Sequence, residues 1–251
     1  DLLIESLQLV SNVVERRQTL PVLSNMRLVA KEETLEMVGT DLEIELHASV
    51  KVSAESPGEI TVPAKKMNDI WRSLPSGQTV LMEQVGDKLK IKTGRSSFSL
   101  STISVSEFPE GLGEANDQGI DIDSGVFCEA IEEVAFAMAQ QDVRYFLNGM
   151  LLESEGEKLR AVATDGHRLA LSSRKIIADG DVNESGDKAS KQAILPRKSV
   201  IELGRLLSDE DDTAEIGFGE NHLIANFGAF RLTSKLVEGQ IPDYKKVQPV
   251  G

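Results

Sequence analysis

The sequence predicts an α+β fold made of two copies of one domain, each with two helices backed by antiparallel sheets. Segments of the first half recur, in the same order, in the second half. Each half begins with apolar residues at helical spacing and continues with short runs in which apolar and polar residues alternate. The repeat is much longer than a solenoid repeat, so two globular domains are expected.

The composition is typical of a globular protein from a reducing compartment. Of the 251 residues, 40% are hydrophobic and only 4% are aromatic, which predicts two domains with aliphatic cores. The single cysteine, Cys128, excludes an internal disulfide, and its apolar neighbours favour a small buried residue over a catalytic thiol. We expect neither a membrane-spanning segment nor a signal peptide, and therefore a cytoplasmic protein without a membrane partner.

The internal matches define the two copies. The matching pairs are Leu23–Met26 with Leu147–Met150, Thr40-Asp41 with Thr164-Asp165, Val62–Lys66 with Leu195–Ser199, Phe98–Leu100 with Phe230–Leu232, and Phe108-Pro109 with Ile241-Pro242. A stretch rich in glycine and acidic residues, 110–118, separates the copies. We therefore predict domains at 1–112 and 118–244, with 245–251 beginning a linker.

Within each copy the predicted order is helix, strands, helix, strands. Amphipathic helices are expected over 1–15 and 124–139, because apolar residues recur there at helical spacing. Alternating runs predict strands at 27–30, 35–39 and 44–50 in the first copy. A second helix should begin at Pro63 or Pro196, since proline is tolerated in the first turn. Further strands at 79–83, 89–93 and 97–101 close the first copy.

The second helix carries the same charge pattern in both copies, on what should be one helix face. The residues are Lys65, Asp69 and Arg72 in the first copy and Lys198, Glu202 and Arg205 in the second. For either helix alone, the ordinary interpretation is a solvated face with ion pairs worth about 0.2–0.5 kcal/mol each. Recurrence of the pattern in a chain of net charge −14 favours a segregated basic surface that faces a polyanion.

Five segments resemble the bacterial DNA sliding clamp family, the beta subunit of DNA polymerase III. They are Thr19–Asn25 and Gly39–Glu43 for the first domain, and Gln141–Met150, Ala163–Ala170 and Ser234–Tyr244 for the second. The resemblance covers nearly the whole chain. It implies the sliding-clamp fold in both domains, within a homodimeric ring whose helices line a hole for duplex DNA.

The resemblance also implies three sets of site residues. The DNA-facing set is Arg17, Lys65, Arg72, Gln140, Gln141, Arg144, Tyr145, Arg197, Lys198 and Arg205. The partner-peptide cleft set is Leu147, Thr164, Gly166, His167, Arg168, Leu169, Pro242, Lys246 and Val247. The subunit-contact set, on an expected edge strand at 94–100, is Arg95, Phe98 and Leu100. Lys246 stands where the family often has arginine.

By the same resemblance, the protein is a processivity factor of DNA replication. The expected partners are duplex DNA, bound without sequence specificity, the DNA polymerase III alpha subunit, the clamp loader, and other polymerases and repair proteins that dock through short linear peptides. No cofactor, metal or catalytic residue is implied. The family continues into a third domain, so we expect this chain to be a fragment that cannot close a ring by the family's dimer contact. Because the chain begins at Asp1 without Met, inside an expected helix, we also expect its natural start to be missing.

Two other functions compete with this interpretation. An enzyme would need a constellation such as Thr164, Asp165 and His167, but neighbours in a strand and turn point in different directions and do not make a triad. His47 and His222 fit no metal-ligand spacing, and neither a P-loop nor a dinucleotide fingerprint is present. A peptide-binding scaffold without a DNA function fits the cleft residues equally well, but it does not account for the repeated basic stripe.

Overall fold

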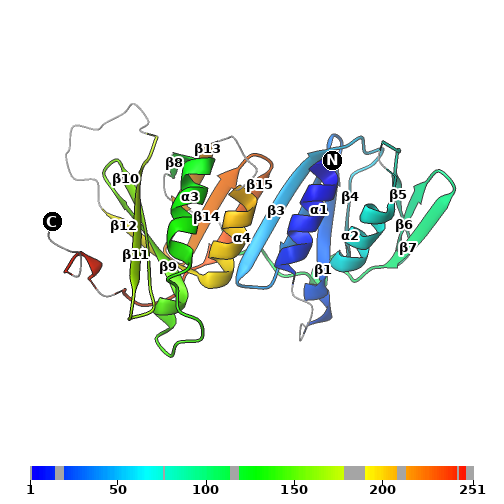
Figure 1. The fold of residues 1–251 in the computed structure, drawn as a ribbon. Helices are drawn as coiled ribbons and strands as arrows, with labels where there is room; N and C mark the ends of the chain where they lie inside the picture. The colour runs from blue at the N-terminus through cyan, green and yellow to red at the C-terminus, as the bar shows by residue number, and fades with distance from the viewer. Residues whose placement is uncertain are drawn as a thin grey trace. The chain divides into compact units, whose positions relative to one another are not determined.

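The computed structural model describes residues 2–14, 20–75, 77–113, 119–177, 190–207, 213–241 and 243–246. The chain divides into two compact units. Unit 1 comprises Asp1–Leu112 with Ala229–Leu232, and unit 2 comprises Gly113–Gly228 with Thr233–Gly251. Helices and antiparallel sheets make up both units, so the predicted α+β class is confirmed (Figure 1).

Unit 1 packs two helices against antiparallel strands. Its elements are α1 (Leu2–Val13), β1 (Asn25–Lys31), β2 (Thr34–Thr40), β3 (Ile44–Lys51), β4 (Gly58–Pro63), α2 (Ala64–Ser73), β5 (Leu81–Val85), β6 (Lys88–Thr93) and β7 (Ser96–Ser101). The strands run in the orders β4-β1-β2-β3 and β5-β6-β7. Helix α1 contacts α2, β2 and β3. It approaches β2 so closely that a Cβ at Gly39 would lie 2.8 Å from a Val10 methyl group.

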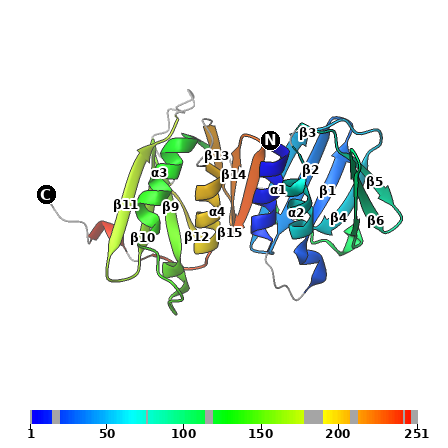
Figure 2. The same ribbon diagram turned by 45° about the vertical axis from the view of Figure 1, so that its right-hand side comes forward.

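Unit 2 repeats this plan. Its elements are β8 (Ile120–Asp123), α3 (Ser124–Ala135), β9 (Gly149–Glu155), β10 (Lys158–Thr164), β11 (Leu169–Lys175), β12 (Lys191–Pro196), α4 (Arg197–Leu207), β13 (Thr213–Phe218), β14 (His222–Phe227) and β15 (Phe230–Lys235). The strand orders are β11-β10-β9-β12 and β15-β14-β13-β8. Helices α3 and α4 lie side by side against these strands, with α3 on β10 and β11 and α4 on β9 and β12 (Figure 2). Short 3-10 helices occupy Pro21–Ser24, Val105–Glu107, Tyr145–Asn148 and Tyr244–Lys246.

The same turn links β2 to β3 and β10 to β11. In unit 1, the Thr40 hydroxyl donates to the Ile44 carbonyl at 2.8 Å and the Asp41 carboxylate accepts from the backbone amide of Ile44 at 2.7 Å. Thr164, Asp165 and Arg168 make the corresponding bonds in unit 2, at 2.6 and 3.0 Å. This shared hydrogen-bond pattern explains why the Thr-Asp pair recurs in the sequence, because both side chains satisfy the turn's backbone groups.

The cores are mainly aliphatic, as the composition predicts. In unit 1 the fully buried side chains include Leu7, Met26 and Met67, and the only tryptophan, Trp71, is 4% exposed. Cys128 is also buried, as predicted, and its sulfur donates to the Gly204 carbonyl. No helix in the described ranges is long and apolar enough to cross a membrane.

Three local predictions were wrong. Pro63 and Pro196 end strands β4 and β12, so the second helices begin one residue later. Helix α3 ends at Ala135 and not at Ala139, because the Ala139 amide donates to the Leu147 carbonyl and draws the chain out of the helix. The predicted strand at 79–83 is β5 over Leu81–Val85.

The charged face predicted on the second helices is exposed in only one unit. On α2, Lys65, Asp69 and Arg72 are all exposed. On α4, Glu202 is only 7% exposed and accepts a hydrogen bond from Arg205 Nη1 at 2.7 Å. Burial raises the pKa of Glu202. The placement of Glu202 on a solvated face was therefore wrong, and a buried carboxylate with an arginine partner replaces it.

Candidate functional site

The turn at 164–168 is tied to the end of helix α3 by one arginine. Arg168 Nε lies 2.9 Å from the Asp165 carboxylate, and Arg168 Nη2 donates to the Phe136 carbonyl at 2.8 Å. The Arg168 guanidinium also lies 5.3 Å from the centre of the Phe136 ring, which is 59% exposed. A cation over an aromatic face adds to the hydrogen bond. Arg168 therefore fixes the turn against the end of α3 and leaves an aromatic surface beside it.

A second arginine lies against the same turn. Arg144 pairs with Asp142 through two bonds, from Nε at 3.0 Å and from Nη2 at 2.9 Å. This bonding holds the pKa of Asp142 at about 2. Gly166 adopts a φ of 87°, and a Cβ there would lie 3.2 Å from Arg144 Nη2. Glycine at this position thus permits both the left-handed backbone and the close approach of the guanidinium.

The other cleft residues differ in exposure. Leu147 is 2% exposed and belongs to the core, whereas Leu169 is 36% exposed. Thr164 is buried within the turn, and His167 is exposed. The Lys246 side chain is 81% exposed, with Nζ 3.2 Å from the Asp243 carboxylate. Pro242 and Val247 lie outside the described residues. Thr164, Gly166, His167 and Arg168 thus come together at the turn, while Leu147 lies beneath the surface.

Sequence reasoning missed Asp142 and Phe136, which hold the two arginines, and also the pair formed by Glu153 and Tyr244. The Tyr244 hydroxyl donates to the Glu153 carboxylate, and both residues are buried, at 5% and 2% exposure. The one signal in the sequence was a glutamate, Glu153, directly after the apolar residues Met150–Leu152. Its partner lies 91 residues away and could not be identified from spacing.

The predicted DNA-facing residues have several different surroundings. Lys65, Arg72, Gln140, Gln141, Arg144, Tyr145 and Arg205 are exposed, whereas Arg197 and Lys198 are half-buried. Arg197 Nη1 lies 3.4 Å from the Met138 carbonyl. Gln141 has a left-handed φ of 58°, and the Tyr145 side chain is 74% exposed. Arg17 lies outside the described residues. The set therefore includes two exposed cations on α2, Lys65 and Arg72, and an arginine, Arg144, that lies against the turn at Gly166.

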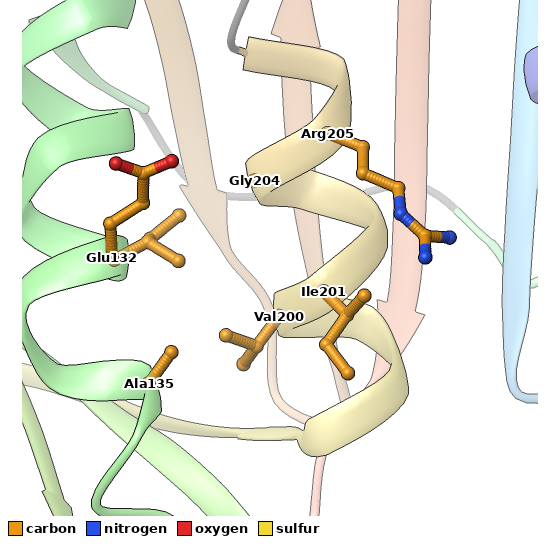
Figure 3. Close-up of a pocket in the computed structure, with 7 residues that line it drawn as sticks. Glu132, Ala135, Val200, Ile201, Gly204 and Arg205 are labelled. Atoms are coloured by element: carbon orange, nitrogen blue, oxygen red, sulfur yellow. The ribbon is translucent and has the colours of Figure 1, made fainter.

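A shallow hollow of about 290 Å³ lies between α3 and α4. Figure 3 shows Ala135 and Val200 facing each other across it, with Glu132 on α3 and Arg205 on α4 at its margins. The remaining lining residues are Ile131, Ile201 and Gly204. The Arg205 guanidinium points away from Glu132 (Figure 3). This lining offers no nucleophile with an adjacent base, so the hollow has no catalytic arrangement.

The comparisons with known proteins identify both units. Residues 1–112 match the family model for the DNA polymerase III beta subunit, N-terminal domain, and residues 121–243 match the model for its central domain. The chain belongs to the DNA polymerase III beta subunit family. The beta sliding clamp of Pseudomonas aeruginosa is 49% identical over 99% of this chain, and that of Escherichia coli K12 is 43% identical over 98%. The chain spans 66% of the length of each relative.

A solved beta subunit has the same fold. The Pseudomonas aeruginosa sliding clamp bound to griselimycin superposes with a TM-score of 0.91 at 46% identity, covering 99% of this chain and 66% of that chain. The resemblance inferred from the five sequence segments is therefore confirmed. Among the described residues of this beta subunit chain, no group of three or more His, Cys, Asp or Glu side chains is arranged to hold a metal ion.

Two of the expected subunit-contact residues, Phe98 and Leu100, lie on strand β7, and Arg95 lies in the turn that precedes it. β7 is the outer member of the order β5-β6-β7. Within the predicted segment, Arg95 is exposed, Phe98 is half-buried and Leu100 is 5% exposed. One edge of β7 pairs with β6, with Phe98 opposite Ile91. Among the described strands, none pairs with the other edge of β7, which is therefore available to a further strand. The role of these three residues in a subunit contact stays a prediction.

Proposed function

We propose that this chain forms part of a DNA sliding clamp, a ring that encircles duplex DNA and holds a replicative polymerase on it. The observation that carries the proposal is the match of both units, in order, to consecutive domains of one DNA polymerase III subunit. In this proposal the ring is a homodimer, and residues 245–251 lead toward a third domain. The relatives of known structure that share the fold are themselves sliding clamps.

In the proposed clamp, the helices face DNA and contact its phosphates loosely. Exposed Lys65 and Arg72 on α2 support this, because they are cations on a shared face of a strongly acidic chain. Phosphate contacts position a protein without reading bases, which suits a ring that must slide. Asp69 lies between them and moderates the attraction. The contact is therefore expected to be weak and salt-dependent, with retention provided by closure of the ring.

Partner proteins are proposed to dock at the turn of 164–169 through short linear peptides. The two arginines, exposed His167 and partly exposed Leu169 combine polar groups with an apolar wall, which suits an extended peptide with aliphatic side chains. The partners are the DNA polymerase III alpha subunit, the clamp loader, and other polymerases and repair proteins. Griselimycin, which binds the relative from Pseudomonas aeruginosa, is proposed to bind at this turn.

The proposed clamp is a non-catalytic protein of the cytoplasm that needs no cofactor. Thr164 and Asp165 support this, because their side chains are used to close the turn and are not free to activate a nucleophile. His167 lies beside them, yet its backbone amide, and not its ring, bonds to Asp165. Loss of hydrolase or transferase turnover in a His167→Ala variant would contradict the proposal.

The deciding experiment loads the full-length protein onto nicked circular DNA with its clamp loader. The expected result is retention on circles in high salt and release when the circle is cut, because Coulombic binding weakens with salt whether or not the DNA has ends. Linear DNA of the same length is the control. Equal loss from both would refute the clamp and leave a peptide-binding scaffold without a DNA function as the better explanation.

A further inference from the structure

Glu153 is a carboxylate buried in the middle of strand β9. It is 2% exposed, and its neighbours in the apolar run, Leu151 and Leu152, are buried with it. A charge removed from water is costly unless partners replace its hydration. The arrangement around Glu153 must therefore offset that cost, and the partners indicate what the residue holds in place.

Two of the partners come from the strands on either side. Arg160 in β10 and Gln192 in β12 both lie opposite Glu153 in the strand register. Arg160 Nη1 lies 3.0 Å from Glu153 Oε2, and Gln192 Nε2 lies 2.7 Å from Glu153 Oε1. These contacts are internal to the sheet, so they stabilise unit 2 without involving any other segment.

The remaining partners come from the segment that leaves the sheet. The Tyr244 hydroxyl donates to Glu153 Oε2, and Lys245 Nζ lies 3.6 Å from Glu153 Oε1. Burial raises the pKa of Tyr244 to about 12, and the bond to Glu153 adds to this, so the phenol stays a donor at every working pH. One buried carboxylate thus joins three strands to residues 244–245.

The Tyr244 ring packs in an apolar cluster of unit 2. It belongs to a cluster with Leu151, Val162 and Ile194, and Phe146 and Ile241 pack against that cluster. Phe146 directly precedes Leu147, and Lys246 follows two residues after Tyr244. The position of Tyr244 therefore constrains where Lys246 lies relative to this cluster and to Phe146, the neighbour of Leu147 in the predicted cleft set.

We propose that the Glu153–Tyr244 pair positions residues 243–246 as one wall of the partner-peptide cleft, which makes Glu153 a positioning residue for peptide binding. This inference rests on the proposed function, because it assigns a role within that cleft. Glu153 is too buried to touch a peptide and acts through Tyr244. Residues 243–246, which Tyr244 anchors, include Lys246. Among the described residues that follow Leu169 in the sequence, Lys246 is the one member of the cleft set.

A Tyr244→Phe variant separates positioning from stability. It removes the hydroxyl while it keeps the ring in its cluster and keeps both cross-strand partners of Glu153. Griselimycin affinity should fall about three- to tenfold, the effect of one hydrogen bond, at temperatures well below the melting transition. Glu153→Gln should weaken binding at least as much. The double variant should bind no more than about twofold more weakly than Glu153→Gln alone, since both changes remove the same bond.

The experiment uses the full-length protein and measures griselimycin affinity by calorimetry, the melting temperature, and retention on nicked circles. Glu157→Gln, an exposed residue in the turn after β9, is the matched control and should bind as the unmodified protein does. Weaker griselimycin binding with unchanged retention on circles supports the inference. Griselimycin binding within twofold of the unmodified protein in both variants would overturn the positioning inference but not the proposed cleft. A parallel loss of griselimycin binding, retention on circles and melting temperature would have the same consequence, because it would indicate a general loss of stability. If the unmodified protein itself fails to bind griselimycin, the proposed cleft is overturned as well.

Discussion

Replacement of Gly166 by alanine tests whether the turn and Arg144 together shape the cleft. Gly166 has a φ of 87°, a conformation that costs an L-residue about 1–2 kcal/mol. The new methyl group would also lie 3.2 Å from Arg144 Nη2, so the guanidinium must move by a few tenths of an ångström. Because the pair of Arg144 with Asp142 is exposed, this movement adds little to the loss of stability.

The expected stability loss for Gly166→Ala is therefore about 1–2 kcal/mol, and it comes from the backbone. The expected effect on ligand binding is separate, because the displaced guanidinium lies beside the proposed cleft. A loss of about 1 kcal/mol in binding free energy corresponds to roughly fivefold weaker affinity. Chemical denaturation measures the first quantity, and calorimetric titration of the full-length protein with griselimycin measures the second.

Gly156 provides a matched control in the turn between β9 and β10. It has a φ of 61°, and a Cβ there would meet nothing within 4 Å. Gly156→Ala should therefore cost a similar amount of stability and leave griselimycin affinity unchanged. If the two alanine variants bind griselimycin equally well, the placement of Arg144 against Gly166 has no role in binding and the reasoning is wrong.

Three further predictions follow from other parts of the molecule. His47 lies 2.8 Å from both Glu36 and Glu45, and although burial opposes it, these carboxylates raise its pKa above the ordinary 6.5. Unit 1 should therefore gain stability from His47 below pH 6.5 and lose it as the pH rises through the raised pKa, a dependence that His47→Gln should abolish in melting curves recorded between pH 6 and 9. Lys65→Glu together with Arg72→Glu should weaken DNA binding and flatten its salt dependence, measured by titration at several salt concentrations, while the melting temperature stays within a few degrees. Phe98→Asp on edge strand β7 should shift the full-length protein from dimer to monomer in sedimentation, and an unchanged dimer would show that this edge is not the subunit contact.

The fold was predictable because it depends on patterns that are local in sequence. The repeated Thr-Asp pair marks the same turn in both units, since its side chains bond to backbone groups only two to four residues away. The strands β2 and β3 follow their alternating runs closely. The proposed cleft residues around Gly166 were identified by resemblance, and the turn explains why four of them lie together.

The remaining features depend on contacts between distant segments. Helical spacing places Glu202 on the polar face of α4, but the same spacing on α2 leaves Asp69 exposed, so spacing alone cannot tell the two apart. Tyr244 and Glu153 are 91 residues apart, and nothing local marks them as partners. Arg144 has the charge expected of a DNA contact, yet it pairs with Asp142 and lies close to Gly166 in the turn.

A comparison of the two turns explains how one repeated scaffold can carry the proposed cleft in only one of its copies. The backbone bonds are the same, but Leu42 holds the left-handed position in unit 1, with a φ of 77°, where unit 2 has Gly166. Ile44, at the position of Arg168, is 1% exposed and belongs to the core. Phe108 is buried in a cluster with Val22, Leu23 and Val38. The hydrogen bonds that build the turn therefore leave its outward residues free to diverge, and in unit 2 those residues are glycine, histidine and arginine.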